Sequence, residues 1–251
     1  MKHPQLMLNL EENGIYKHEK TTSVKVTRFR NLWSNFSRRR QKTMFVRTGG
    51  CDYHCDWCDS AFTWDGSEKP TMMTSDQIIE ALDKLGTYDY VTLSGGNPCL
   101  LAANMAQLVR KLKKRQVTLA VETQGSRWQE WLKAIDQVTL SPKPPSSKMK
   151  VNLQTLDFIV SNLDPQKVTY KIPIFDEDDL KFAQMIQGRY QPDVLYLSVG
   201  NPEPKASGDI VQNQLKRLKE LWEHIAQDDS WGNVRVLPQL HTLVYDNKRG
   251  V

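Results

Sequence analysis

The chain has 251 residues, of which 25% are charged and 39% hydrophobic, and this balance is typical of a globular protein with a real core. No stretch approaches the roughly 20 apolar residues of a membrane span, and no signal segment opens the chain, so we expect no membrane partner. The net charge of +5 comes from residues 1–50, which hold eleven Lys/Arg and three Asp/Glu, and does not describe the rest of the chain. One close-set cysteine group without a regular framework indicates a reducing, cytoplasmic setting.

Strand-like and helix-like segments alternate from residue 44 onward. The predicted order is strand 44–48, helix 74–85, strand 90–94, helix 104–114, strand 117–122, helix 128–135, strand 137–141, strands 156–160 and 169–174, helix 178–187, strand 194–199, helix 209–226 and strand 234–237. Repeated β-then-α units predict a mostly parallel sheet with right-handed crossovers. The units are too few for a complete eightfold barrel, so we predict an α/β fold of the partial TIM-like barrel type with its site at the C-terminal strand ends.

Three cysteines follow the first predicted strand with C-x3-C-x2-C spacing: Cys51, Cys55 and Cys58. The fourth cysteine, Cys99, lies far away in the sequence. Structural zinc usually takes four closed ligands, whereas three thiolates can hold a cubane [4Fe–4S] cluster and leave one iron open. The spacing therefore favours an iron–sulfur cluster with an open iron, and zinc is the alternative.

Further motifs accompany the cysteines along the chain. They are Phe45-Val-Arg-Thr-Gly-Gly-Cys51, Cys58-Asp-Ser-Ala-Phe-Thr-Trp64, Ser94-Gly-Gly-Asn-Pro98, Glu122-Thr-Gln-Gly125, Ser141-Pro-Lys-Pro-Pro-Ser-Ser-Lys-Met149, Leu237-Pro-Gln-Leu-His-Thr-Leu243 and Asn247-Lys-Arg-Gly-Val251. This ordered set resembles the 7-carboxy-7-deazaguanine synthase family of the radical S-adenosylmethionine (SAM) superfamily. The resemblance covers residues 41–251 nearly continuously, so we expect those residues to form one radical SAM domain.

The resemblance implies a lyase that contracts the ring of 6-carboxy-5,6,7,8-tetrahydropterin to 7-carboxy-7-deazaguanine and releases ammonia, in queuosine or other 7-deazapurine biosynthesis. It implies a [4Fe–4S] cluster, SAM and Mg²⁺ as cofactors. The cofactor-derived radical does the difficult chemistry, while the protein binds, orients and excludes water. The resemblance also implies a homodimer that takes electrons from a donor of the flavodoxin type.

Individual roles follow from the positions that match the family. The resemblance assigns Cys51, Cys55 and Cys58 to the cluster and the hydroxyl of Ser60 to Mg²⁺, which takes few protein ligands. It assigns Arg47 and Ser94 to the pterin, since a planar guanidinium suits a carboxylate. The positions assigned to SAM or its surroundings are Trp57, Asp59, Gly96, Glu122, Ser141, Pro142 and Lys143.

Several of these residues also have ordinary structural interpretations. Trp57 could be packing over the cluster, Ser60 a loop residue and Lys143 a solvated strand end. Asn97 replaces the Glu that many radical enzymes have after Gly-Gly, and we expect its amide to accept from an ammonium. Cys99 is predicted to be a small buried hydrophobe. His241 and residues 198–201 either line the site or belong to the structure alone.

The N-terminal segment departs from the family. Relatives carry a loop resembling E-I-F-G-P-T-x-Q-G-E-G before Gln41-Lys-Thr-Met-Phe-Val-Arg47, and this chain has Asn31-Leu-Trp-Ser-Asn-Phe-Ser-Arg-Arg-Arg40 instead. One choice of codons for residues 31–40, read one base later, gives I-F-G-P-T-F-Q-G-E-G. Our hypothesis is that at least residues 31–40 are an out-of-frame reading, so that segment 1–40 lacks the substrate loop and the first strand. We then expect cluster assembly with poor turnover, and no nucleic acid binding by 38–40.

Two other functions fit part of the sequence. An activating enzyme that makes a glycyl radical on a protein also uses C-x3-C-x2-C, but it does not explain the 141–149 motif. A zinc-binding interaction module with a basic nucleic-acid arm explains the cysteines and 38–40, but it does not explain the Gly-Gly-Asn-Pro and Glu-Thr-Gln-Gly motifs.

Overall fold

The structure is a computed structural model that describes residues 24–28, 43–204 and 208–247. Its strands form one eight-stranded sheet in sequence order: β1 (Val24–Arg28), β2 (Thr43–Thr48), β3 (Tyr90–Gly95), β4 (Thr118–Thr123), β5 (Gln137–Leu140), β6 (Val168–Ile174), β7 (Leu195–Val199) and β8 (Val234–Leu237). Strands β2 to β8 are parallel, and β1 pairs antiparallel with β2. Within the described residues β8 does not pair with β1, so the predicted partial barrel is confirmed.

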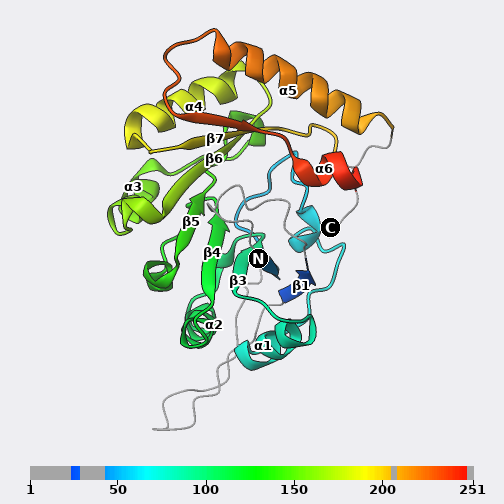
Figure 1. The fold of residues 1–251 in the computed structure, drawn as a ribbon, viewed down its shortest axis with the longest axis vertical. Helices are drawn as coiled ribbons and strands as arrows, with labels where there is room; N and C mark the ends of the chain where they lie inside the picture. The colour runs from blue at the N-terminus through cyan, green and yellow to red at the C-terminus, as the bar shows by residue number, and fades with distance from the viewer. Residues whose placement is uncertain (1–23, 29–42, 205–207, 248–251) are drawn as a thin grey trace.

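Helices cover the outer side of the curved sheet (Figure 1). The α-helices of the described residues are α1 (Ser75–Lys84), α2 (Ala103–Lys114), α3 (Leu153–Ser161), α4 (Glu177–Tyr190), α5 (Ile210–Ala226) and α6 (Leu240–Tyr245). The short helix α6 differs from the others, because it lies at the open side of the sheet near the loop that follows β2 (Figure 1). This open side is where the C-terminal strand ends and the cysteine loop come together.

The two faces of the strands differ in chemistry, as period-2 alternation requires. Buried apolar side chains such as Met44, Val46 and Leu93 point toward the helices. The residues between them, including Arg47 and Glu122, line the interior of the curve. The sheet therefore packs its apolar face under helices and keeps a polar face for a ligand.

Local signals explain the helix boundaries. Thr74 caps α1 through a reciprocal pair of hydrogen bonds with Gln77, and Asp176 caps α4 by accepting from the Asp179 backbone N–H. Asn152 caps α3 by accepting from the Thr155 backbone N–H. Each of these three helices thus begins at a side chain that satisfies one of its free N–H groups.

Two predictions about elements were wrong. Residues 156–160 lie within α3 and not in a strand, because a parallel β5-to-β6 connection needs a crossover helix and Asn152 supplies its cap. The expected loss of the first strand is also wrong, since Val24–Arg28 pairs with β2. The segment 128–135 forms a tighter 3₁₀ helix over Glu130–Ala134, and α6 was not predicted at all.

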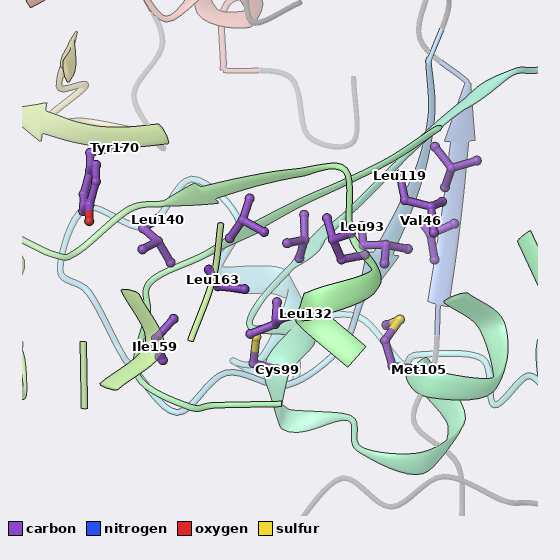
Figure 2. Close-up of a cluster of buried hydrophobic side chains, with 14 of the residues drawn as sticks. Val46, Leu93, Cys99, Met105, Leu119, Leu132, Leu140, Ile159, Leu163 and Tyr170 are labelled. Carbon is purple, nitrogen blue, oxygen red and sulfur yellow. The ribbon is translucent and has the colours of Figure 1, made fainter. Parts of the chain in front are cut away.

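Cys99 belongs to the hydrophobic core. Its side chain is 0% exposed and lies beside Leu132 among the buried residues in Figure 2. Cys99 does not line the interior cavity, and its burial in the core confirms the prediction of a small buried hydrophobe.

Candidate active site

A cavity of about 360 Å³ lies against the polar face of the sheet and the loops after its C-terminal strand ends. Most of the predicted site residues line this cavity: Arg47, Cys51, Cys55, Trp57, Cys58, Asp59, Ser60, Ser94, Gly96, Glu122, Ser141 and Lys143. The undecided residues Ser198, Asn201 and His241 line it as well. Parallel strands end at one edge of the sheet, so residues far apart in sequence reach the same space.

The cysteine loop presents three free thiols to this cavity. Backbone hydrogen bonds shape the loop, including those from Gly50 N–H to Thr63 O at 2.7 Å and from Cys58 N–H to Cys55 O at 3.2 Å. Burial raises the pKa of all three thiols, that of Cys55 to about 12. A metal that binds here must therefore displace their protons.

The donor set fits an iron–sulfur cluster. Three sulfurs and no fourth cysteine reach the cavity, which matches three-thiolate ligation of a cubane with one open iron. The indole Nε1 of Trp64 is buried beside Cys58, and as a hydrogen-bond donor it lowers the pKa of that thiol against the larger effect of burial. A buried N–H donor beside the thiols suits a cluster whose sulfurs accept hydrogen bonds.

Gly95 at the end of β3 and Gly96 after it pack against the end of β2 and the start of the cysteine loop. A Cβ on Gly96 would lie 2.1 Å from the Gly50 carbonyl oxygen, and one on Gly95 would lie 2.3 Å from the Thr48 carbonyl oxygen. The φ of Gly95 is also +136°, which favours glycine. The close packing of these backbones therefore requires glycine at both positions, whether or not a ligand also approaches them.

Four polar side chains form a chain along one wall of the cavity. Arg47 Nη1 donates to Ser60 Oγ at 2.9 Å, Ser60 Oγ donates to Asp59 Oδ1 at 3.0 Å, and Asp59 Oδ2 lies 3.5 Å from His241 Nε2. Burial by itself raises the pKa of Asp59. The hydrogen bond and charge of His241, together with the charge of Arg47, lower it by more, so the pKa lies below its usual range. His241 reaches the site because α6 folds over the open side of the sheet.

A second charged pair lies deeper in the cavity. Lys171 Nζ is 2.9 Å from Glu122 Oε1, across the strands β4 and β6. The charge of Lys171 lowers the pKa of Glu122, and Glu122 raises that of Lys171 against the opposing effect of burial. Both side chains are partly exposed, but they line the interior cavity, so the pair is shielded from bulk solvent.

Trp57 is held by the segments after β5 and β6. Its ring stacks on Phe175 at 4.6 Å between centroids, and its Nε1 donates to Ser146 Oγ at 3.0 Å. Lys143 Nζ donates to Ser141 Oγ at 2.9 Å in the same segment. The 141–149 motif thus both lines the cavity and fixes the cysteine loop from the side.

Comparison with known proteins identifies the family. Residues 45–164 match the family described as the radical SAM superfamily. A 7-carboxy-7-deazaguanine synthase from Bacillus subtilis is 46% identical over 221 residues, which cover 84% of this chain and 90% of that protein. One from Bacillus cereus is 45% identical over 217 residues, which cover 84% and 91%. The chain belongs to the 7-carboxy-7-deazaguanine synthase family.

The fold agrees with membership of the 7-carboxy-7-deazaguanine synthase family. The crystal structure of QueE from Escherichia coli superposes with a TM-score of 0.54 at 18% identity, covering 86% of this chain and 92% of that chain. Enzymes of the radical SAM superfamily carry a [4Fe–4S] cluster and use SAM. The substrate of the 7-carboxy-7-deazaguanine synthase family is a small molecule. Family membership therefore decides against the zinc module and the glycyl-radical activating enzyme. None of the described helices has the length and apolar character needed to span a bilayer.

Two predicted details differ from the structure. Pro142 is buried and does not line the cavity, although Ser141 and Lys143 on either side do. The amide of Asn97 is 0% exposed and is already bonded within the protein, so it does not face a ligand ammonium as expected. Both residues shape the site from behind its wall.

Four further residues in or beside the site were not predicted from the sequence. They are Lys171, Gln124, Asp52 and Trp64. Lys171 was detectable in principle as a charged residue at an inward position of an otherwise apolar strand. The contacts of Asp52 and Gln124 link residues more than 70 positions apart, and no local pattern shows such a contact.

Proposed function

We propose that the chain is a carbon–nitrogen lyase that converts 6-carboxy-5,6,7,8-tetrahydropterin to 7-carboxy-7-deazaguanine and ammonia, within 7-deazapurine biosynthesis such as that of queuosine. The observation that carries this proposal is the cavity itself, which brings the three cysteines, the Gly-Gly strand end and Arg47 to one space in a chain of this family. When bound, the cluster and SAM supply a 5′-deoxyadenosyl radical that takes a hydrogen atom from the substrate. The protein binds, orients and encloses the reactants.

Cys51, Cys55 and Cys58 hold the cluster in this proposal. SAM takes the side of the cavity formed by Gly96, Ser141 and Lys143, with Trp57, Asp59 and Glu122 around it. The hydroxyl of Ser141 and the ammonium of Lys143 are already hydrogen-bonded to each other, which orients both toward polar groups of a ligand.

The pterin carboxylate binds Arg47, with Ser94 beside it. The Nε of Arg47 is buried and has no hydrogen-bond partner among the described residues, so the side chain has a donor to offer to an anion. Arg47 and Ser94 are direct neighbours across β2 and β3, and both line the cavity. A guanidinium in this position fixes a carboxylate by paired hydrogen bonds.

Mg²⁺ binds at Ser60 in this proposal and is completed by a substrate oxygen. The support is the Asp59 carboxylate, whose Oδ1 lies 3.0 Å from Ser60 Oγ and whose lowered pKa keeps it charged. The ion would displace the Arg47 N–H from Ser60, which releases Arg47 toward the substrate carboxylate. We also infer a homodimer in the cytoplasm that receives electrons from a donor of the flavodoxin type.

The N-terminal forty residues form a separate part of the proposal. Residues 29–42 lie outside the described residues, so the frame hypothesis for 31–40 stays a prediction. The alignments to the Bacillus relatives leave about one sixth of this chain unmatched, a share as large as residues 1–40. The domain is then 41–251, preceded by an atypical segment 1–40.

Anaerobic reconstitution with iron and sulfide tests the cluster. We expect a brown protein whose broad absorbance disappears when Cys51, Cys55 or Cys58 is changed to Ala. The matched control is Cys99→Ala, which removes a thiol from the core and leaves the absorbance unchanged. A colourless protein with one tightly bound zinc, or equal loss of colour in all four variants, would contradict the assignment.

Incubation of the loaded protein with the pterin, SAM, Mg²⁺ and dithionite tests the reaction. We expect 5′-deoxyadenosine and 7-carboxy-7-deazaguanine, in low yield from the chain as it stands. A loaded protein that cleaves SAM yet forms no 7-carboxy-7-deazaguanine, even with the family's substrate loop restored, would refute the proposed substrate.

A further inference from the structure

We propose that Asp52, Asn97 and Gln124 form a clamp that positions Cys51, and that Gln124 tunes the reduction potential of the cluster by donating a hydrogen bond to the Cys51 sulfur. The clamp joins the cysteine loop to the ends of β3 and β4. The inference rests on the assignment of Cys51 to the cluster in the proposed function.

Asp52 is the centre of the clamp. Its Oδ1 accepts from Asn97 Nδ2 at 2.8 Å and from Gln124 Nε2 at 2.6 Å, and its Oδ2 accepts from Ser126 Oγ at 2.8 Å. Arg127 Nε lies 3.5 Å from the same Oδ2. The residue that follows Cys51 is therefore tied to two strand ends that are remote in sequence.

Asn97 is fully used within the clamp. Its Nδ2 donates to Asp52 and to Ser126 Oγ at 3.0 Å, while its Oδ1 accepts from Thr123 Oγ1 at 2.9 Å and from the Cys99 backbone N–H at 3.1 Å. A backbone N–H can only donate, so it fixes which end of the amide is the oxygen. With both hydrogens and both acceptor positions engaged, Asn97 orients Asp52 and has nothing left for a ligand.

Gln124 connects the clamp to the sulfur. Its side chain is 4% exposed, and its Nε2 lies 3.6 Å from Cys51 Sγ as well as 2.6 Å from Asp52 Oδ1. One hydrogen of the amide thus serves the carboxylate and the other serves the sulfur. The backbone N–H of Tyr53 also donates to Cys51 Sγ, at 3.4 Å.

Hydrogen bonds to cysteine sulfur change cluster chemistry in a known direction. An N–H donor withdraws charge from a ligating thiolate and stabilises the reduced, more negative cluster, which raises the reduction potential. Gln124 is then a positioning residue that acts through Cys51 and Asp52. Loss of its donor makes the cluster harder to reduce without removing any ligand.

The test compares Gln124→Leu with the parent chain after anaerobic reconstitution, with iron and sulfide content measured in both. Leu keeps a similar volume and removes the donor. The matched control is Gln129→Leu, because Gln129 Nε2 donates to the Cys99 carbonyl oxygen at 2.8 Å and touches no cluster cysteine. The readouts are the midpoint potential in a dithionite titration and the electron paramagnetic resonance spectrum of the reduced cluster.

We expect Gln124→Leu to load iron and sulfide as the parent does, with a more negative midpoint potential. At one fixed solution potential, its reduced cluster should be about three- to tenfold less populated, and its spectrum should change. Gln129→Leu should match the parent in both readouts. A loaded Gln124→Leu protein with the parent's potential and spectrum would overturn the role of Gln124.

A second measurement tests the clamp without a cluster. In hydrogen–deuterium exchange of the unloaded chains, Asp52→Ala should expose the amides of residues 51–58 to at least several-fold faster exchange, and Gln129→Leu should not. Equal exchange in Asp52→Ala and the parent would overturn the clamp. A parent chain that loads no cluster would instead refute the proposed function, while this exchange experiment still decides the clamp.

Discussion

At the scale of single residues, several charged side chains of the cavity wall lie beside partners of opposite charge. Glu122 and Lys171 pair across the sheet, and Asp59 lies between Ser60 and His241. Such pairs leave a polar, largely neutral wall, and a partly shielded pair becomes costly when one partner is removed.

Lys171→Met should lower the free energy of unfolding by about 2 kcal/mol at pH 7, between the values for exposed and buried pairs. Lys171 holds the pKa of Glu122 below its ordinary 4.5, so the stabilisation is present above that value and is lost as pH falls through the lowered pKa. The difference in the free energy of unfolding between parent and variant should therefore narrow below pH 4.5. Denaturant unfolding between pH 3 and 7 measures it, and a gap independent of pH would contradict the ionised pair.

Gly96→Ala should displace the cysteine loop, because its Cβ would lie 2.1 Å from the Gly50 carbonyl oxygen. We expect about 3 kcal/mol of destabilisation and loss of most cluster loading. The control is Gly188→Ala in α4, where an added Cβ meets nothing within 4 Å and helix propensity should stabilise by about 0.5–1 kcal/mol. Thermal unfolding and iron content of both variants decide the matter, and normal loading of Gly96→Ala would contradict it.

At the scale of elements, the start of α4 supports the site from outside. The buried carboxylate of Asp179 accepts from the Ser146 backbone N–H at 3.0 Å and from the Phe175 backbone N–H at 2.9 Å. Ser146 in turn bonds Trp57, and Phe175 stacks on it. One helix terminus thus holds both partners of a cavity-lining aromatic ring.

Asp179→Ala should lower the free energy of unfolding by about 2–3 kcal/mol, because two partly buried backbone N–H groups lose a buried acceptor. It should also weaken SAM binding severalfold by loosening Trp57. Thr74→Ala removes the cap of α1 away from the cavity and should cost about 1 kcal/mol with no change in SAM affinity. Denaturant unfolding and calorimetric titration of SAM separate the two effects; equal SAM affinity in both variants would argue against the support from α4.

At the scale of the whole molecule, our proposal places the cluster residues in the described cavity and expects the substrate side to need the family's N-terminal loop. All three cysteines, the Gly-Gly strand end and the 141–149 motif meet at one cavity. The family's Q-G-E-G loop has no counterpart in the sequence of residues 31–40 as it stands.

Replacement of residues 31–40 by I-F-G-P-T-F-Q-G-E-G should raise product formation at least about 100-fold, since correct placement of the substrate governs the rate. Cluster content should not change, because the replacement leaves Cys51, Cys55 and Cys58 unaltered. A product assay with matched iron content measures the effect. Equal activity of the two chains would show that the segment 1–40 is genuine and sufficient.

The sequence alone predicted most of the fold, and it predicted the [4Fe–4S] cluster and SAM that this superfamily uses. Alternation of apolar residues and the capping signals located seven of the eight strands, and the cysteine spacing with its accompanying motifs indicated the family. These features are local or have a fixed order along the chain, so they can be read without a structure. The strand predicted at 156–160 failed because its short apolar run fits both a strand and a helix, and only the β5-to-β6 crossover distinguishes them.

Only the tertiary structure decided how the site is held together. The Asp52 clamp, the Glu122–Lys171 pair and the approach of His241 to Asp59 all join residues that are distant in sequence. Asn97 gives the clearest case, because its sequence position indicated a ligand contact while its buried hydrogen bonds point to the cysteine loop. A motif records which side chains are present, but the folded sheet decides which partners their polar atoms meet.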